Sequence, residues 1–575
     1  MKKNIVLSLV TAAVMPLTLV SCSGTGEADI KESSEVSENM TENVTEEPTG
    51  EITGELTETE TEYSTEELTE TEIEDDVEPL EYERVSIDEV NETAEKLLED
   101  VKISGNEKAV QEDIDKLLEY NDRANDLVSY SALDFNYDWQ NDAISKKDDT
   151  LNEDLAVIDA GLTYTFCNAA LYEEYAELFT DLIFDDPELN EVYTARGMSL
   201  KKAEGYAGVD FKLADESLDE YYDIIYDETL SDDEKDLKCA EIYIDILSEY
   251  DAETFYDLYY RDFTPQETEK TADIVFEELI PAYNAIVNAY VELDENDELF
   301  NIKGVKEPFE VIRKYAPQLS ESIKESVDML IDENLYLIGD ETKSLDAGFT
   351  TGLPTTHKAL IYNMIYDNYR DLTDCVHEFG HFYAICKDRT PSFLQIANTD
   401  VAEIQSQALE IIFTRFYDEI YGENANLVRA AVMIDLVNTI IDAFAIGEFE
   451  YEMVKNIDTL SPQDIVDTFD SMVKTIEPND RFYYVNHLFE QPGYYVSYGV
   501  SALAAFNIFD ENIDNPELAV EKYEKIAAIS AYSPECRFRE SLKQSGFDDI
   551  FTEEYIRNLA ARITQYAEDL KKNSK

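Results

Sequence analysis

Histidine and basic residues are scarce in this chain. Only four histidines occur among 575 residues, and 44 Lys and Arg stand against 129 Asp and Glu, which gives a formal net charge of -85. Binding to nucleic acid or to an anionic membrane through a basic face needs the opposite balance, so the composition excludes both. We interpret the acidity as a source of solubility for an exported protein, with a preference for basic substrates as the alternative.

Cysteines are also few and lack paired spacing. After Cys22 the chain contains Cys167, Cys239, Cys375, Cys386 and Cys536. An odd, sparse set of this kind predicts neither a disulfide framework nor a zinc knuckle. Cys375 and Cys386 would be separated by about 16 Å on a helix, which is beyond the reach of a disulfide. We therefore expect buried thiols.

Long apolar runs are absent beyond the first 22 residues, so no other segment is expected to span a bilayer. Those residues contain two lysines, an apolar stretch and the ending Leu-Val-Ser-Cys, an order typical of an export signal. The ending resembles a bacterial lipobox, which implies lipid attachment at Cys22 and a place on the outer cell surface. Stable anchoring needs two or more acyl chains. A plain signal peptide beside a chance cysteine is the alternative.

The next segment is rich in Glu, Thr and Ser. Residues 23 to 80 contain 21 acidic residues against Lys31, with almost no bulky apolar clusters. Such a segment cannot bury enough surface to offset its chain entropy. We predict a disordered acidic stalk over residues 23–82.

Helical periodicity begins at about residue 83. Val110, Ile114 and Leu117 follow the spacing of one helix face, and similar amphipathic runs recur to the C-terminus. Proline-containing stretches such as DDPELN and LIPAYN are expected to interrupt them. Residues 335–366 differ, because Gly, Pro and Thr separate short apolar stretches there, which predicts a small sheet.

The stretch TDCVHEFGHFYAICKD follows this predicted sheet and contains His377, Glu378 and His381 in the order H-E-x-x-H. Chance would produce about 0.004 such matches in a chain of this composition. Residues 370–387 read as a helix, so the two histidines share one face. Two imidazoles so placed can bind one zinc ion, with Glu378 directed at the water that the ion holds.

A zinc peptidase needs a third protein ligand. In the extended form of the motif a further histidine would stand at position 387, but Lys387 is there, so that subclass is excluded. A carboxylate is the natural third ligand, and Glu403 lies near the start of a helix predicted from Asn398. The alternative is a capping role, in which Thr399 or Asp400 caps this helix and Glu403 completes a capping box.

HEFGH followed by VAEIQSQALE is similar to the zinc oligopeptidases of the thimet oligopeptidase and oligoendopeptidase F family. The resemblance implies that His377, His381 and Glu403 bind one zinc ion per chain. It also matches Glu410 to a further glutamate of the motif, which we expect to orient a ligand imidazole. The alternative for Glu410 is a solvated charge.

The segment HLFEQPGYYVSYGVSALAAF begins at His487 and extends the resemblance. It implies that His487, Tyr494 and Tyr498 lie across the cleft from the metal and hydrogen-bond the substrate carbonyl and the oxyanion. The two tyrosines are four residues apart, which predicts that they share one helix face.

Upstream, DAGFTTG resembles the family's strand pair before the zinc helix, whose edge would accept an extended peptide. Gly348 and Phe349 are the implied substrate contacts, although the order Ala347-Gly348-Phe349 departs from the family's usual Gly-Ala-aromatic order. His357, between the two strands, is expected to be structural or solvent-facing.

The resemblance implies a mostly α fold, with a thermolysin-like zinc peptidase core within two helical halves that flank a deep substrate channel. We therefore expect an N-terminal helical region over 83–200 and a catalytic metallopeptidase region over 201–575. The implied activity is zinc-dependent hydrolysis of internal bonds in short, unstructured oligopeptides, with Glu378 as the base. A lipid-anchored peptide-binding protein is one alternative, but it gives Glu378 no role. An inactive peptidase scaffold is the other, but the implied ligand set is complete.

Overall fold

The computed structural model describes residues 83–573, apart from 181, 183–217, 474–480 and short gaps at 219, 228, 249, 251, 253–254, 257–258, 260, 295–298 and 341. The predicted signal peptide, Cys22 and the stalk over 23–82 lie outside the described residues. So does the predicted boundary between residues 200 and 201. Residues from Glu83 onward belong to one compact unit.

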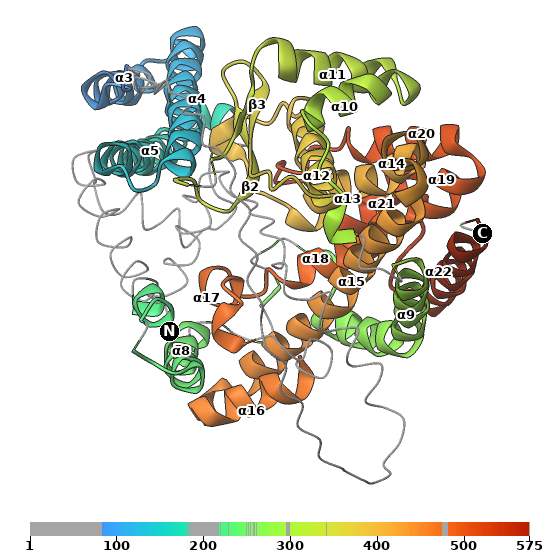
Figure 1. Ribbon diagram of the computed structural model, residues 1–575. Coiled ribbons are helices and arrows are strands. Elements are labelled where there is room, and N and C mark those ends of the chain that lie inside the picture. Colours follow the sequence, from blue (N-terminus) through green and yellow to red (C-terminus); the bar gives the residue numbers. More distant parts are fainter. Residues whose placement is uncertain are drawn as a thin grey trace, which may run out of the picture. The chain divides into compact units, whose positions relative to one another are not determined.

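Helices account for most of the described fold (Figure 1). The α-helices are α3 (Ile87–Asp100), α4 (Glu107–Tyr137), α5 (Asp142–Ala169), α8 (Asp232–Leu247), α9 (Pro265–Leu293), α10 (Pro308–Tyr315), α11 (Glu321–Asp332), α12 (Arg370–Ile385), α13 (Thr399–Phe413), α14 (Tyr417–Tyr421), α15 (Ala425–Asn456), α16 (Pro462–Met472), α17 (His487–Glu490), α18 (Val496–Ala505), α19 (Phe509–Asp514), α20 (Pro516–Ile526), α21 (Phe538–Ser545) and α22 (Glu553–Asn573). Short 3-10 turns are η1 (Ala176–Phe179), η3 (Leu299–Asn301), η4 (Ala316–Gln318), η5 (Ser392–Leu394), η6 (Thr414–Phe416), η7 (Gly422–Asn424), η8 (Ile457–Thr459), η9 (Phe482–Tyr484) and η10 (Phe506–Ile508).

The predicted sheet is present over the expected residues. Its strands are β1 (Tyr336–Ile338), β2 (Gly348–Leu353) and β3 (Lys358–Asn363), in the order β1-β3-β2. β3 is parallel to β1 and antiparallel to β2. α4 packs on one side of the sheet and α12 on the other, and the described residues provide no second strand partner for β2. The mostly α fold with a small sheet beside the histidine helix is thus confirmed.

The N-terminal helices follow the predicted periodicity. Val110, Ile114 and Leu117 are at most 1% exposed on α4, in a core that α3 and α5 complete. One expected interruption is wrong, because Pro281 of LIPAYN lies inside the continuous helix α9. α9 packs along both α15 and α22. This tertiary packing stabilises the helix despite the backbone hydrogen bond that proline cannot make.

One stretch among the described residues, Thr399–Thr459, is long and apolar enough to cross a membrane by length and composition alone. Within its apolar window 78% of the residues are buried in the structure. The stretch runs from α13 through α15, and these helices pack against α12, α18 and α9. Its apolar character therefore serves the core of the unit.

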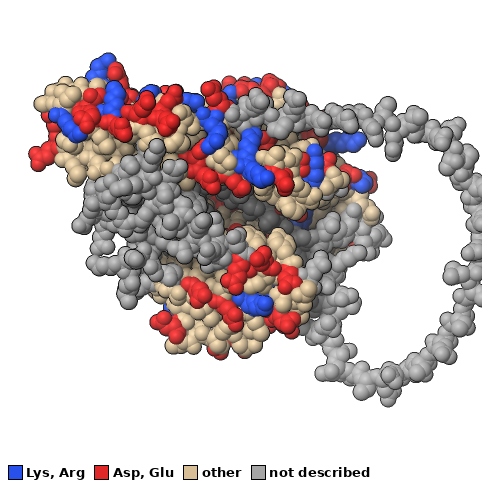
Figure 2. Space-filling model, turned by 90° about the vertical axis from the view of Figure 1, so that its left-hand side faces the viewer, with Lys and Arg blue, Asp and Glu red and all other residues tan. Residues whose placement is uncertain are grey.

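Charged side chains are dispersed over the visible face of the described residues. Figure 2 shows Asp and Glu scattered over this face, with Lys and Arg interspersed among them. Dispersed charge of one predominant sign keeps molecules apart in solution.

Gly380 allows α12 and α13 to approach closely. A methyl group on Gly380 would lie 2.6 Å from the Cα atom of Ser406 and 2.8 Å from the carbonyl oxygen of Gln405. Both contacts are to backbone, so a substitution has to push the two helices apart.

We expect Gly380→Ala to lower the free energy of unfolding by about 1–3 kcal/mol, the usual effect of overpacking. The urea dependence of unfolding measures this change. Gly352→Ala is the control, because a methyl group there would only touch Ile385 at an ordinary 3.5 Å. Equal stability of the two variants would contradict the prediction.

Candidate metal centre

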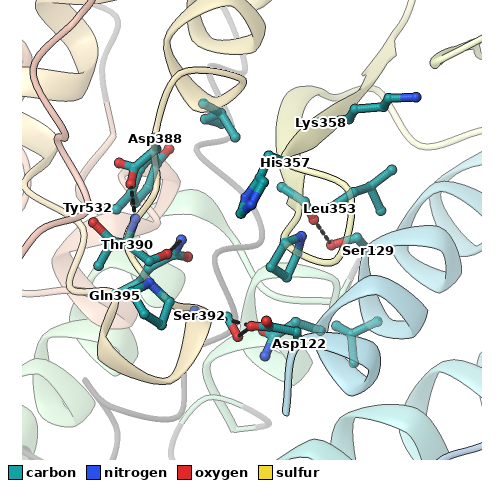
Figure 3. Close-up of a pocket in the computed structure, with 16 residues that line it drawn as sticks. Asp122, Ser129, Leu353, His357, Lys358, Asp388, Thr390, Ser392, Gln395 and Tyr532 are labelled. Atoms are coloured by element: carbon teal, nitrogen blue, oxygen red, sulfur yellow. Dashed lines mark hydrogen bonds between the residues drawn. The ribbon is translucent and has the colours of Figure 1, made fainter. Parts of the chain in front are cut away.

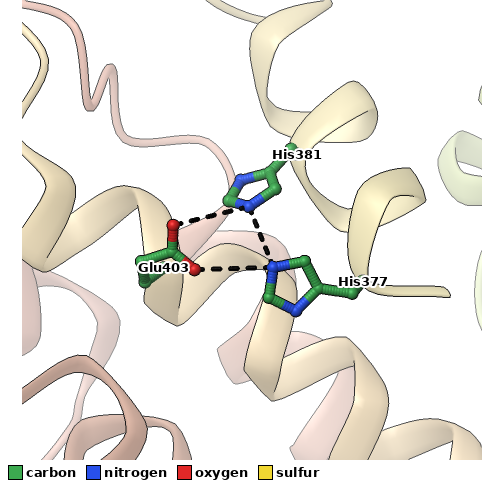
Figure 4. A group of neighbouring side chains, drawn as sticks. All are labelled: His377, His381 and Glu403. Carbon is green, nitrogen blue, oxygen red and sulfur yellow. Dashed lines mark hydrogen bonds and ion pairs between the residues drawn. The ribbon is translucent and has the colours of Figure 1, made fainter. Parts of the chain in front are cut away.

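The helix α12 brings His377 and His381 together. They lie one turn apart, their Nε2 atoms are 3.2 Å apart, and their residues are 9% and 2% exposed (Figure 4). The predicted helix over 370–387 is confirmed as Arg370–Ile385. Both imidazoles are therefore held on the side of α12 that faces α13.

Glu403 meets both histidines from α13. Its Oε2 atom lies 3.5 Å from Nε2 of His377, and its Oε1 atom lies 3.8 Å from Nε2 of His381. The residue is 0% exposed. The predicted cap is wrong, because Asn398 caps α13 by accepting the N–H of Val401. Glu403 is thus directed at the histidines and does not close a capping box.

The three side chains form a donor set suited to a metal ion. One ligand atom from each of His377, His381 and Glu403 lies within 4.8 Å of the others. Burial lowers the pKa of His381 to about 4, which keeps the imidazole neutral with a free lone pair. Burial opposes the charge on Glu403, but its contacts with His381 and His377 outweigh burial and hold its pKa below the ordinary value. Imidazole nitrogens and a carboxylate oxygen are ligands that zinc prefers.

Glu410 contacts His377 from the other side of the ring. Its Oε1 atom lies 2.6 Å from Nδ1 of His377, and the residue is 8% exposed. Glu410 is therefore not a solvated charge. An Nδ1–H group that donates to this carboxylate leaves Nε2 as the lone-pair nitrogen toward Glu403.

Glu378 is held between α12 and the sheet. Its Oε2 atom accepts a hydrogen bond of 2.7 Å from Thr350 of β2, and the residue is 2% exposed. Burial raises the pKa of Glu378 to about 8, although His377 and Thr350 act in the opposite direction. A methyl group on Gly348 would come within 3.4 Å of Oε1 of Glu378. The glycine therefore keeps space open beside this carboxylate.

The strand alternation separates the two predicted substrate contacts. Gly348 and Thr350 face Glu378, whereas the ring of Phe349 is 0% exposed and stacks on Tyr362 at 5.4 Å. Successive strand residues point to opposite faces of a sheet. Phe349 therefore has only its backbone available to a substrate.

His487, Tyr494 and Tyr498 form a second cluster. The Oη atom of Tyr498 is 3.4 Å from Nε2 of His487, and the Tyr494 ring stands edge-on to both neighbours at 4.9 and 5.2 Å. The tyrosines do not share a helix face as predicted, because Tyr494 precedes α18. A turn at Gly493, with φ of +86°, brings its ring to the cluster instead.

The second cluster is carried by elements that pack on the helix of Glu403. α18 packs against α13, and the hydroxyl oxygens of Thr399 and Ser497 are 3.0 Å apart.

The sequence did not reveal the role of Thr350, although its position two residues after Gly348, on the same face of the strand, was a usable signal. It also gave no sign of Arg261, whose buried guanidinium group lies 3.0 Å from Asp400 of α13.

A pocket lies at the far end of β2, beside the β2–β3 turn (Figure 3). Asp122, Ser392 and Asp388 line it, and the exposed His357 borders it from the turn. Asp122 accepts a hydrogen bond from the Ser392 hydroxyl, and burial raises the pKa of this carboxyl. His357 itself is exposed, which confirms the expectation that it faces solvent.

Comparison with known proteins finds likeness only at the level of structure. No family model matches the chain, and no curated protein matches it. A solved chain provisionally named oligoendopeptidase F aligns with a TM-score of 0.66 at 15% identity, over 86% of this chain and 99% of that one. Pz peptidase A with an inhibitor aligns with a TM-score of 0.63 at 13% identity, over 85% and 98%. A provisional oligoendopeptidase F from Bacillus anthracis str. Ames aligns with a TM-score of 0.57 at 14% identity, over 85% and 97%.

Likeness at this identity shows a shared fold, whereas function has to be argued from the site. The site contributes a buried cluster of His377, His381 and Glu403. The chain has the fold of oligoendopeptidase F and Pz peptidase A structures, with a His-His-Glu cluster that could hold a metal ion.

Proposed function

We propose that this protein is a zinc-dependent endopeptidase that hydrolyses internal peptide bonds of short, unstructured oligopeptides at the outer cell surface. The observation that carries the proposal is the buried Glu378 carboxylate, held by Thr350 beside the His377–His381–Glu403 cluster. A structural role gives no reason to bury this carboxylate next to three potential metal ligands.

His377, His381 and Glu403 would hold one zinc ion per chain. Zinc bound there would supply a Lewis acid, would lower the pKa of a water molecule toward neutrality and would favour the ionised form of Glu378 against the effect of burial. Glu410 keeps the His377 ring oriented for binding through its 2.6 Å contact with Nδ1.

Glu378 acts as the general base. It accepts a proton from the attacking water and later delivers that proton to the amine of the leaving peptide. The Thr350 hydroxyl donates to one carboxylate oxygen and leaves the other for this transfer. His487, Tyr494 and Tyr498 are the donors that we assign to the substrate carbonyl and the oxyanion.

The free side of β2 is the place for the substrate. The described residues pair β2 only with β3, so an extended peptide can add along the other edge by backbone hydrogen bonds. Gly348 adjoins Glu378 at this strand, and the absence of a side chain leaves room for the scissile bond. Backbone pairing selects extended, unfolded peptides over folded proteins.

The sequence of residues 1–22 supports the location. Its export signal and lipobox-like ending would attach the protein to the membrane through Cys22. Fractionation of cells that express Cys22→Ala tests this part, since the variant should leave the membrane fraction. Retention in that fraction would contradict the anchor.

Metal content and cleavage of a mixed peptide library by the purified protein test the proposed activity. We expect one zinc ion per chain and cleavage at internal bonds. A protein that takes up zinc and binds peptides without cutting them would be a peptide-binding protein. A protein that takes up no zinc would be an inactive scaffold.

We expect Glu410→Gln to lower zinc affinity by about 10-fold to 100-fold, because the amide is a weaker partner for the His377 ring than a carboxylate. Competition with a chromogenic chelator measures the affinity. Glu419→Gln, on the exposed surface of α14, is the control and should retain native affinity. Equal affinity in both variants would show that Glu410 does not orient the ligand.

A further inference from the structure

Arg261 carries a charge inside the protein. Its side chain is 0% exposed, and its Nε atom lies 3.0 Å from Oδ2 of Asp400. Nη1 donates to the carbonyl oxygen of Gly493 at 2.9 Å, and Nη2 donates to Oγ of Ser497 at 2.7 Å. One guanidinium group therefore joins three chain segments.

These partners adjoin the proposed catalytic residues. Asp400 lies in the first turn of α13, three residues before Glu403. The other two partners immediately precede Tyr494 and Tyr498. Arg261 thus connects the helix of the third metal ligand to the segment that bears both tyrosines.

Other side chains hold the same turn. Tyr259 donates to the carbonyl oxygens of Gln491 and Pro492 at 3.2 and 2.9 Å. The N–H of Gly493 donates to Glu450 at 2.7 Å. Glycine suits this turn, because its φ of +86° disfavours other residues and a Cβ atom there would lie 3.1 Å from the Phe255 ring.

Packing alone does not explain a buried ion pair here. Burial opposes the charge of Arg261, but Asp400 outweighs it and keeps the pKa above its ordinary value. An apolar replacement of similar volume often stabilises a protein as well as a buried ion pair does. A guanidinium group, however, has a planar fork of donors that sets the direction of each partner.

We propose that Arg261 is a positioning residue for catalysis, which sets Tyr494 and Tyr498 relative to the helix of Glu403. The inference rests on the proposed function, since it assigns Arg261 an effect through those residues. A lysine at this position retains a charge for Asp400. It cannot reproduce the forked contacts to the turn and to α18, because an ammonium group is a single point of charge.

The test compares Arg261→Lys with Arg415→Lys in the full chain. Arg415 is also largely buried, and its Nε atom donates to Asn512 at 3.0 Å and to the carbonyl oxygen of Ile412 at 3.1 Å. Arg415 lies in η6 and joins the end of α13 to α19 through these contacts. We expect Arg261→Lys to lower kcat by about 100-fold with little change in KM and in zinc content. Arg415→Lys should keep the native kcat.

A double-mutant cycle separates positioning from general loss of structure. If Arg261 acts through the tyrosine segment, Arg261→Lys and Tyr498→Phe together should lower kcat by less than the product of the two single effects. Hydrogen exchange adds a readout that does not depend on activity. The backbone amides of residues 491–498 should exchange faster in Arg261→Lys than in Arg415→Lys.

Multiplicative effects on kcat, or unchanged exchange in residues 491–498, would overturn the inference and leave Arg261 as a structural ion pair. A native protein that cuts no peptide would instead refute the proposed function. The hydrogen-exchange measurement would still test whether Arg261 stabilises the turn at Gly493. If Arg261→Lys does not fold, Ser497→Ala replaces it, because it removes the Nη2 contact and the contact with the Thr399 hydroxyl while the guanidinium group stays in place. A native kcat in Ser497→Ala would then overturn the inference.

Discussion

The Glu378→Gln variant is expected to keep its zinc and its peptide affinity while kcat falls by about 100-fold to 10,000-fold. The amide has nearly the same shape and can still accept the Thr350 hydroxyl, but it cannot take a proton from water. General acid–base catalysis contributes a factor of this size. Zinc analysis, equilibrium peptide binding and steady-state kinetics on one preparation measure the three quantities.

The matched control is Glu419→Gln, which makes the same chemical change on the exposed surface of α14. It should have native kinetics. Native kcat in Glu378→Gln would show that this carboxylate is not the base. Loss of zinc in Glu378→Gln would show that the residue holds the metal site together, and the loss of activity would then have a different cause.

Tyr498→Phe is expected to lower kcat by about 100-fold to 1000-fold, the usual effect of removing one oxyanion donor. KM should change little, because charge on the carbonyl oxygen develops only in the transition state. The ring and its packing on Tyr494 remain, so the fold is retained. Steady-state kinetics of the native protein and the variant on the same series of peptides give both kcat and KM.

Tyr484→Phe is the control for this substitution, since Tyr484 is 66% exposed and lies in the same region of the chain. It should leave kcat unchanged. An increase in KM with native kcat in Tyr498→Phe would assign the hydroxyl to substrate binding, and the oxyanion role would be wrong. His487, 3.4 Å from the Tyr498 hydroxyl, would then be the next donor to test.

Local spacing was sufficient to predict the elements of the metal centre. His377 and His381 are four positions apart, which corresponds to about one helical turn, so the helix alone sets this pair. The sheet before it followed from short apolar runs between Gly, Pro and Thr. Glu403 needed the family resemblance, because a first-turn glutamate is equally typical of a capping box.

Contacts between distant parts of the chain could not be predicted where no family motif marks the residues. The Thr350 contact with Glu378 depends on how β2 lies on α12, and the Tyr494 ring reaches its cluster through a turn at Gly493. Pro281 remains inside a helix because packing on two other helices outweighs its local preference.

The sequence by itself determined the mostly α class, the small sheet and the pair of histidines, because each depends on periodicity within a few turns or strands. Only the tertiary structure decided that Glu403 faces the histidines, that Glu410 contacts His377, and that Arg261 connects α13 to the segment that bears Tyr494 and Tyr498. Such contacts depend on the packing of segments that lie far apart in the chain, and residue spacing along one segment carries no information about them.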